Sequence, residues 1–468
     1  METITVITPY EGRRIWAEPN RTLVVDPAWD VVVASGRQVY AVSDGVLPDG
    51  VHDLHTWWRA VRAGRTPPWV ESASADPREI AVLVQTLFDS RHPFAPAGLA
   101  AAADLVVEEE LWRHRFRAGL RADRNRAIAT RDSLQAARRA LQHAVGVDLT
   151  RRTAETVHWL QARGVDAQLS NGDTGYARID SPKNALLDLD RWPELEHWLT
   201  ADELGKRLRH VGMVANGADR DGRVRPDIAI NGADTGRTIY RNPNVTALRK
   251  DHRPLLLADP GHVLVSADYA NAELRTAAAF VDDPAFTAMV TGTDIYSMLG
   301  RAVGTTRPIA KRSLIAMLYG QHEKGLARNV GAELARNLRS VVAQMLPALS
   351  DWQKNVTLAG RAGEPLRTLR GRRLPALDPN KAYRAANWLI QGSARDALGE
   401  GVRGVAGILG PEALWASVHD ELIVQVPRGL EDEAVDALCR GLTVTLPGTN
   451  IALPVEAKVF GDRWRAGP

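Results

Sequence analysis

Cysteine is almost absent from this sequence, since Cys439 is the one cysteine among 468 residues. A single cysteine excludes an internal disulfide framework and a cysteine-rich zinc site, and it suits a reducing compartment. Long apolar runs are also missing, because no stretch reaches the roughly 18 residues that a transmembrane helix needs. The first residues, METITVITPYEGRR, lack the charged start and apolar core of a secretory signal. We therefore expect a cytoplasmic protein without a membrane anchor.

Charge is nearly balanced over the whole chain, with a formal net charge of +3, but it is unevenly distributed. Residues 301–400 hold 17 Lys and Arg against 7 Asp and Glu, a net charge of +10. Such an excess fits an anionic partner such as nucleic acid, and it equally fits a basic face in solvent. Residues 100–145 have a helical pattern in which Arg113, Arg117 and Arg121 would share one helix face.

The pattern of the sequence changes several times along the chain. Residues 1 to about 95 contain short β-type runs and then a proline-rich stretch, which predict a small α/β module of their own. Residues 150–210 predict further short helices, broken at Asn171-Gly172 and Ser181-Pro182. Residues 213–247 are rich in turn-forming residues and predict hairpins and loops.

The first segment with a chemical pattern is residues 262–280. The apolar run Val263–Val265 predicts a buried strand, and Asp268 lies between this strand and the helical run AELRTAAAF. A carboxylate at the end of a strand is held by rigid backbone and can face a cleft, which suits a ligand of a divalent ion. The alternative is that Asp268 caps the following helix.

The second segment, residues 305–321, predicts a helix that Thr305 or Thr306 caps and that has Pro308 in its first turn. Four of its residues recur at four-residue spacing: Arg307, Lys311, Ile315 and Tyr319. They form a stripe about 18 Å long, with the cations at the positive end of the helix. A triphosphate would bind near the cations and a base near the aromatic end. The alternative is an amphipathic helix with its cations in solvent.

The third segment, residues 414–427, has two apolar runs around His419, Asp420 and Glu421 and predicts a tight β-hairpin with an acidic tip. We expect Asp420 to meet Asp268 across adjacent strands, so that two metal ions about 3.5–4 Å apart could be bridged. One ion would activate a primer 3′-hydroxyl and the other would hold a triphosphate. The alternative is a polar hairpin tip without chemistry.

Together these segments resemble the family A DNA polymerases, the group of bacterial DNA polymerase I and many phage replicases. The family's first motif, Asp-Tyr-Ser-Gln-x-Glu-Leu-Arg, stands here as Asp-Tyr-Ala-Asn-Ala-Glu-Leu-Arg at residues 268–275. The family's second motif has Arg, Lys, an aromatic residue and Tyr-Gly at four-residue spacing, and these stand here as Arg307, Lys311, Ile315 and Tyr319-Gly320. The third is Val-His-Asp-Glu at residues 418–421. The likeness covers roughly residues 100–468. Further matching stretches are Thr235-Gly236-Arg237, Asn242-Pro243-Asn244, Asp294-Ile295, Asn387, Gln391-Gly392 and LPVEAKVFGDRW.

The resemblance implies an α+β fold of the right-hand polymerase type. The polymerase domain would cover residues 96–468, with a thumb at about 100–210, a palm at about 211–284 and 386–468, and fingers at about 285–385. The family often carries a 3′–5′ exonuclease whose metal site begins with Asp-x-Glu, a pattern that does not occur before residue 100. We therefore expect residues 1–95 to be a reduced or unrelated module, and no proofreading.

The resemblance also implies roles for individual residues. The catalytic residues would be Asp268, Asp420 and Lys311. Two Mg²⁺ ions, or Mn²⁺ in their place, would be held by Asp268, Asp420 and the backbone carbonyl of Tyr269. The incoming deoxynucleotide would be bound by Arg307, Lys311, Ile315, Tyr319, Glu273 and Asn271. Primer–template DNA would contact Thr235, Arg237, Arg275, Arg384, Asn387, Gln391 and His419.

Within the nucleotide site, Glu273 would exclude a ribose 2′-hydroxyl, and Tyr319 would hold Glu273 in place. Three residues depart from the family pattern. Ile315 replaces a ring that packs near the incoming sugar and base, which leaves fidelity open. Tyr296 stands where His is common, so one phosphate contact is open, and Asn271 stands for Gln.

The implied protein is a template-directed DNA polymerase, a monomer in the bacterial nucleoid or the cytoplasm of a phage-infected cell, serving DNA replication, repair or lesion bypass. Two alternatives remain. A single-subunit RNA polymerase has a similar palm, and Glu273 and Glu421 argue against it. An inactive nucleic-acid-binding accessory protein is the other, and the intact pair Asp268 and Asp420 argues against it.

Overall fold

The computed structural model describes residues 5–7, 31–33, 51–53, 96–171, 177–180 and 195–465. Its contacts divide the chain into two units, and each is described by itself. The first unit comprises Met1–Arg117, Ile228–Ile239 and Gly261–Val459. The second unit comprises Ala118–Asp227, Tyr240–Pro260 and Phe460–Pro468.

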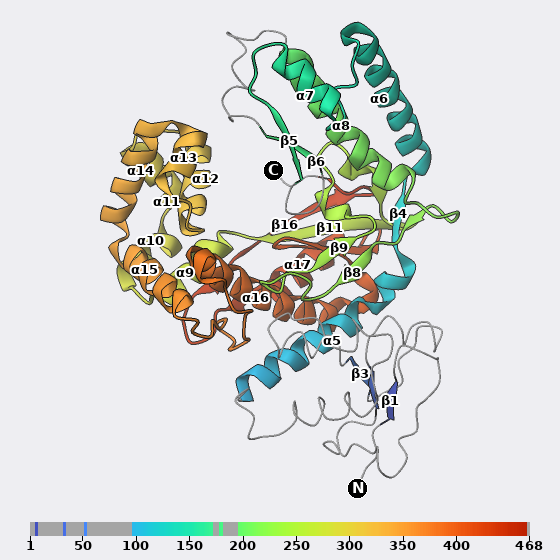
Figure 1. The fold of residues 1–468 in the computed structure, drawn as a ribbon. Coiled ribbons are helices and arrows are strands. Elements are labelled where there is room, and N and C mark those ends of the chain that lie inside the picture. Colours follow the sequence, from blue (N-terminus) through green and yellow to red (C-terminus); the bar gives the residue numbers. More distant parts are fainter. Residues whose placement is uncertain are drawn as a thin grey trace, which may run out of the picture. The chain divides into compact units, whose positions relative to one another are not determined.

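A four-stranded sheet in the order β12-β13-β11-β16 organises the first unit (Figure 1). Its strands are β11 (His262–Tyr269), β12 (Leu414–Val418), β13 (Glu421–Pro427) and β16 (Val455–Gly461). Strand β13 pairs antiparallel with both β12 and β11. Residues 263–267 and 422–426 are buried without a break. Because successive side chains of a strand point to opposite faces, protein covers both faces of β11 and β13.

Two helices pack beside this sheet, α16 (Ala385–Leu409) and α17 (Glu431–Leu442). Helix α17 contacts both β11 and α16. Helix α5 (Pro96–Ala118) belongs to the same unit, and Arg115 Nε donates a hydrogen bond to the Leu414 carbonyl at 3.0 Å. The short elements of this part are β14 (Val444–Thr445), β15 (Ala452–Leu453), η4 (Pro379–Arg384) and η5 (Pro411–Ala413).

A run of seven helices follows β11 in the first unit (Figure 1). They are α9 (Ala272–Val281), α10 (Pro284–Gly292), α11 (Ile295–Ala302), α12 (Arg307–Leu318), α13 (Glu323–Val330), α14 (Ala332–Met345) and α15 (Pro347–Arg361). Local sequence sets several of their starts. The carboxylates of Asp283 and Asp294 accept hydrogen bonds from backbone amides in the first turns of α10 and α11. Proline occupies the first turn of α10, α12 and α15, where its missing N–H is not needed.

The second unit contains a small sheet in the order β10-β4-β7 and three helices. Its elements are β4 (Leu120–Ala122), α6 (Arg124–Val145), α7 (Ala154–Gln161), β5 (Gln168–Asn171), β6 (Ala177–Asp180), α8 (Leu195–Ala215), β7 (Arg223–Val224), η2 (Val245–Ala247), η3 (Arg253–Leu255) and β10 (Leu256–Leu257). Trp159 and Trp198 lie in its hydrophobic core with Leu149, Leu160 and Leu195. The paired strands β8 (Asp227–Ala229) and β9 (Ile239–Arg241) contain the points where the chain passes between the units.

Two local predictions from the sequence are wrong. Arg113 and Arg117 lie on α5, but Arg121 lies on strand β4, because Gly119 at φ 68° ends the helical path. The three arginines therefore do not share a helix face. Residues 150–210 contain the helices α7 and α8, but β5 and β6 form an antiparallel pair between them. Asn171 is the last residue of β5 and pairs with Ala177 of β6.

Other expectations are confirmed. The fold is α+β with antiparallel strand pairs, and residues 213–247 contain the short strands β7, β8 and β9. Strands β1 (Thr5–Ile7), β2 (Val31–Val33) and β3 (Val51–Asp53) pair in parallel. The remainder of residues 1–95, and with it the predicted module, lies outside the described residues. Among the helices that the structure describes, none is both long and apolar enough to cross a membrane.

Candidate functional site

The end of β11 and the tip of the β12–β13 hairpin bring the two predicted aspartates together. Asp268 lies opposite Glu421 in the register of β11 and β13, and Asp420 directly precedes Glu421. Val418 pairs with Glu421 across the hairpin, which leaves a two-residue turn. His419 in this turn has a left-handed backbone at φ 58°. The predicted hairpin with an acidic tip is therefore present.

The helix after β11 is not capped by Asp268. Asn271 occupies the N-cap position of α9 with a left-handed backbone at φ 58°, and its side chain makes no capping hydrogen bond. The alternative in which Asp268 is a helix cap is therefore wrong. The carboxylate of Asp268 remains available for other contacts.

Negative charge is concentrated at Asp268. Protein atoms displace much of the water around its carboxylate, although the residue is still exposed to solvent, and the charges of Asp420 and Glu421 add to this effect. Together they raise the pKa of Asp268 to about 6, and the charge of Lys311 offsets only part of the rise. Glu421 accepts a hydrogen bond from the Ser266 hydroxyl. The site therefore holds carboxylates closer together than their charges favour.

A protein cation lies against the second aspartate. Arg237 Nη2 is 3.1 Å from Asp420 Oδ1 and 3.8 Å from Glu273 Oε1. The Tyr319 hydroxyl donates a hydrogen bond to Glu273. Burial raises the pKa of Glu273, and the charge of Asp420 adds to this rise. The contact by which Tyr319 was expected to hold Glu273 is therefore present, while the part of Glu273 in sugar selection stays a prediction.

The side chains at this site offer oxygen donors. Within the part of the chain that the structure describes, no three His, Cys, Asp or Glu side chains are grouped so as to hold a metal ion by themselves. Carboxylates from two neighbouring strands nevertheless suit a hard divalent cation that keeps water and substrate oxygens as further ligands. Burial and the charges of Asp420 and Glu421 raise the pKa of Asp268, and this supports the fit, because a bound cation would favour the ionised carboxylate. Tyr269, whose carbonyl is the third predicted ligand, is the last residue of β11.

Helix α12 presents the predicted nucleotide stripe. The helix begins at Arg307 with Thr306 at the N-cap position, although the Thr306 side chain makes no capping hydrogen bond. Arg307 and Lys311 are exposed, and Ile315 is half-buried. Tyr319 directly follows the last helical residue, and its amide donates to the Ile315 carbonyl at 3.0 Å. The stripe therefore runs from a solvated cationic end to a partly buried apolar end.

The ring of Tyr296 supports both cations of this stripe. The ring centroid is 5.5 Å from the Arg307 guanidinium carbon and 5.4 Å from Lys311 Nζ. The Tyr296 side chain is 1% exposed, so the ring is fixed by its surroundings. Asp294 Oδ2 accepts a hydrogen bond from Arg307 Nε at 2.7 Å. Cations over an aromatic face are attracted to its negative potential. Tyr296 therefore holds by its ring face two side chains that were predicted to bind phosphate.

The residues predicted to contact DNA lie in several places of the first unit. Arg384, Asn387 and Gln391 are spaced by three and four residues around the start of α16, which puts them on one face. Asn387 Oδ1 is buried and has no hydrogen-bond partner among the described residues. Arg275 Nη1 donates to the Ala452 carbonyl at 3.0 Å. The others are Thr235 and Arg237 between β8 and β9, and His419 in the hairpin turn.

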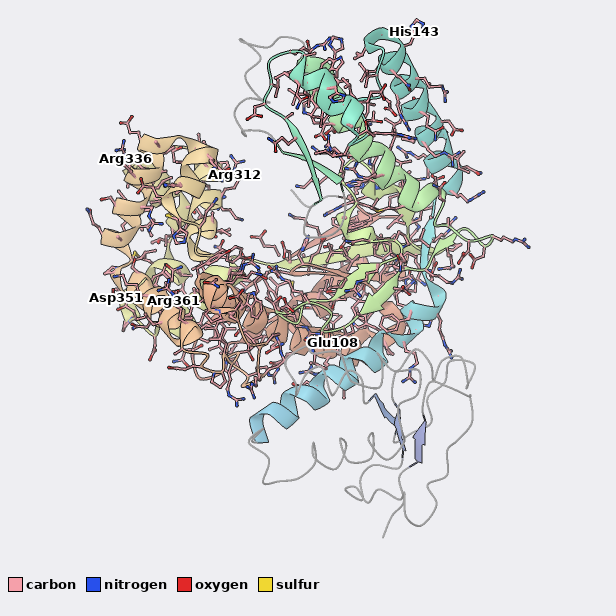
Figure 2. The ribbon with its side chains drawn as sticks, viewed as in Figure 1. Glu108, His143, Arg312, Arg336, Asp351 and Arg361 are labelled. Atoms are coloured by element: carbon pink, nitrogen blue, oxygen red, sulfur yellow. The ribbon has the colours of Figure 1, made fainter. Side chains whose placement is uncertain are left out.

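The basic excess of residues 301–400 is divided between the surface and the interior. Arg312, Arg336 and Arg361 are exposed on α12, α14 and α15 (Figure 2). Arg372 and Arg395 are 2% and 5% exposed and form buried ion pairs. Sequence reasoning missed these two arginines, because a count of cations does not show which of them the fold encloses.

Comparison with known proteins now adds to this geometry. The family model described as DNA polymerase family A matches residues 181–466. The chain belongs to DNA polymerase family A. It is 28% identical over 316 residues to the DNA polymerase I of Aquifex aeolicus (strain VF5), a match that covers 62% of this chain and 52% of that protein. It is 30% identical over 302 residues to the DNA polymerase of Mycobacterium phage L5, covering 62% and 49%. The chain thus spans about half the length of these curated relatives.

A solved structure has the same fold as this family A chain. The polymerase domain of Pol1 from M. smegmatis, in complex with DNA primer-template and dNTP, matches with a TM-score of 0.73 at 21% identity. The match covers 93% of this chain and 86% of that one. The right-hand polymerase fold predicted from the sequence is therefore confirmed. Enzymes of family A generally use divalent metal ions, which agrees with the oxygen donors of the site.

The pKa of Asp268 predicts how metal binding depends on pH. A carboxylate must lose its proton to bind a metal ion, and the pKa of Asp268 is raised to about 6. We expect the affinity for Mn²⁺, measured by calorimetry without DNA or nucleotide, to be nearly constant above pH 7. Below pH 6 it should fall by about tenfold for each pH unit, as protons compete for one carboxylate.

The control for this titration is Asp268→Asn, which should bind Mn²⁺ weakly and with little dependence on pH between 5 and 7. An affinity that stays constant down to pH 4.5 would contradict the prediction, because it would mean that Asp268 titrates as an ordinary aspartate.

Proposed function

We propose that this family A chain extends the 3′-hydroxyl of a primer with deoxynucleoside triphosphates, copying a DNA template. The observation that carries the proposal is the position of Asp268 at the end of β11, next to the hairpin turn that holds Asp420, at a site whose negative charge a metal ion would relieve. The polymerase names of the relatives support it, and so does the primer-template and dNTP complex of the solved structure.

We assign two Mg²⁺ ions to Asp268, Asp420 and the Tyr269 carbonyl, with Mn²⁺ as a substitute. When bound, such ions favour the ionised primer hydroxyl and neutralise charge on the triphosphate. Asp268 is held at the end of a buried strand, and Asp420 is held in a two-residue turn. The two carboxylates are therefore positioned before any substrate arrives.

The incoming nucleotide lies along α12 in this proposal. Arg307 and Lys311 bind the triphosphate at the positive end of the helix, and Lys311 can donate a proton to the leaving pyrophosphate. The sugar and base lie toward Ile315 and Tyr319. Glu273, held by the Tyr319 hydroxyl, excludes a ribose 2′-hydroxyl. Asn271 completes the nucleotide site from the start of α9.

The primer–template lies against the face formed by Arg384, Asn387 and Gln391. Thr235, Arg237, Arg275 and His419 make the remaining DNA contacts. The unpartnered Oδ1 of Asn387 fits this role, because a buried polar atom without a partner gains from a hydrogen bond that a ligand supplies. Arg237 gives up its ion pair with Asp420 when that carboxylate binds a metal ion.

Asp420→Asn tests the metal role directly. Loss of one charged ligand should lower primer extension by at least about 10³-fold, the scale of a lost electrostatic contribution to a transition state. Extension is measured in single turnovers with Mg²⁺, a defined primer–template and saturating deoxynucleotides. The matched control is Asp436→Asn on α17, an exposed carboxylate paired with Arg440, which should extend like the wild type.

Other outcomes of the same experiment would overturn the proposal. Wild-type extension no faster than that of Asp420→Asn would favour an inactive accessory protein. Extension with ribonucleotides as fast as with deoxynucleotides would favour an RNA polymerase. A primer with a 3′ mismatch should stay uncleaved, and its shortening would contradict the expected lack of proofreading.

From the contacts of the Tyr296 ring we predict how two substitutions of this residue change the KM for deoxynucleotides. Tyr296→Phe keeps the ring beside Arg307 and Lys311, so it should change the KM for deoxynucleotides by less than about twofold. Tyr296→Leu removes two cation–π contacts of about 1 kcal/mol each and should raise that KM by about tenfold or more. Steady-state extension of a matched primer measures both. Equal KM values for the two variants would show that the ring does not support the cations.

A further inference from the structure

Two buried arginines hold the backbone directly before Arg237. Arg372 Nη2 donates to the Thr235 carbonyl at 2.9 Å and to the Gly392 carbonyl at 3.1 Å. Arg395 Nε donates to the Gly236 carbonyl at 2.8 Å. Two consecutive carbonyls of this loop are thus fixed by guanidinium groups. Arg395 lies on α16, and Arg372 lies in the segment before that helix.

Each of these arginines has a carboxylate partner that is also buried. Arg372 Nε donates to Asp396 Oδ1 at 2.7 Å, and Arg395 Nη2 donates to Glu108 Oε2 at 2.6 Å. Asp396 is 6% exposed and Glu108 is 3% exposed. Glu108 lies on α5 (Figure 2). Burying two charge pairs costs desolvation energy that apolar residues of the same size would not cost. Buried arginines nevertheless suit this position, because one guanidinium donates hydrogen bonds in several fixed directions and can hold a carboxylate and a loop carbonyl together.

Glycine at two positions makes room for these ion pairs. Gly236 has φ 91°, and a Cβ added there would lie 2.7 Å from the Arg372 guanidinium nitrogens. A Cβ at Gly399 would lie 2.5 Å from Arg395 Nη1 and 2.6 Å from Glu108 Oε2. The loop is also closed on itself, since the Ala233 amide donates to the Arg237 carbonyl at 3.1 Å.

The hydrogen bonds of Arg372 and Arg395 to the loop, together with their ion pairs to Asp396 and Glu108, form a buried clamp next to the site. Arg237 directly follows the two clamped residues, and its guanidinium lies 3.1 Å from Asp420 and 3.8 Å from Glu273. We propose that the buried pairs Arg372–Asp396 and Arg395–Glu108 are positioning residues that fix Arg237 for its contact with the primer–template. This inference rests on the proposed function. It gives Glu108 of α5 a part in primer extension, although its contact with the loop is made through Arg395.

Removing both charges of one pair tests this without leaving a buried charge unpaired. The variant Arg395→Met with Glu108→Leu should keep a cooperative thermal transition. It should extend a primer at least about tenfold more slowly, because small displacements of a contacting group are costly in a catalytic site. Adding Arg237→Ala to this variant should lower the rate no further, whereas Arg237→Ala alone should lower the wild-type rate.

The matched control removes a second ion pair between the same two helices. Arg403 of α16 lies 3.0 Å from the carboxylate of Asp104 on α5 and also donates to the Asp104 carbonyl at 3.4 Å, whereas Arg395 donates to the loop that carries Arg237. The variant Arg403→Met with Asp104→Leu should extend a primer as fast as the wild type. Adding Arg237→Ala to it should lower the extension rate by the same factor as in the wild type. A role of Glu108 and Arg395 in stability alone would lower the thermal midpoint and would leave the full cost of Arg237→Ala in the variant without their pair.

Two results would overturn the inference. The variant without the Arg395–Glu108 pair could extend a primer at the wild-type rate, or adding Arg237→Ala to that variant could lower its rate by as much as it lowers the wild-type rate. Should that variant fail to fold, Arg395→Lys decides, because it keeps the charge beside Glu108 and loses the guanidinium fork that reaches Gly236. A wild-type rate for Arg395→Lys overturns the inference, and a loss of about tenfold supports it. Failure of the wild type itself to extend primers overturns the proposed function as well, and it is seen before any variant is compared.

Discussion

The crowding of partly buried carboxylates where the end of β11 meets the tip of the β12–β13 hairpin is the constraint on which the site depends. The register that places Asp268 opposite Glu421 leaves these side chains no freedom to separate, because a slip of one residue would turn every side chain of β11 to the opposite face. Residues 263–267 and 422–426, all buried and all apolar except Ser266 and Gln425, hold that register by burial on both faces. Burial and the neighbouring charges raise the pKa of Asp268, and a bound cation would offset both effects by favouring the ionised carboxylate.

The cations around this site already have protein partners. Arg237 is paired with the carboxylate of Asp420, and Arg307 with that of Asp294. In the proposed function, binding of metal ions, nucleotide or DNA to these groups would therefore be an exchange of partners. An exchange gains less free energy than a new contact, and its outcome depends on how well each group is placed. Buried and rigid surroundings consequently matter as much here as the charged groups themselves.

Local patterns in the sequence predicted most of the candidate site. A strand that ends at Asp268, a hairpin with Asp420 at its tip and a helix from Arg307 follow from short apolar runs, turn residues and four-residue spacing, all of which are local. The meeting of Asp268 with the hairpin that carries Asp420 was predicted from chemistry that needs both carboxylates. The strand pairing of β5 with β6 and the burial of Arg395 beside Glu108 were not predicted. Such contacts depend on which surfaces meet after folding. The boundaries of thumb, palm and fingers remain a prediction.

The buried clamp explains how one arginine could serve two partners in the proposed function. Arg237 neutralises Asp420 while no metal ion is bound, and it contacts DNA once Asp420 has become a metal ligand. If the loop were mobile, each exchange would also require the backbone to be ordered again, at about 1–2 kcal/mol for each residue. With the carbonyls of Thr235 and Gly236 fixed by hydrogen bonds to Arg372 and Arg395, only the Arg237 side chain has to move. The desolvation free energy of the buried ion pairs is therefore spent once, when the chain folds. Arg237 can then change partner without reordering the loop.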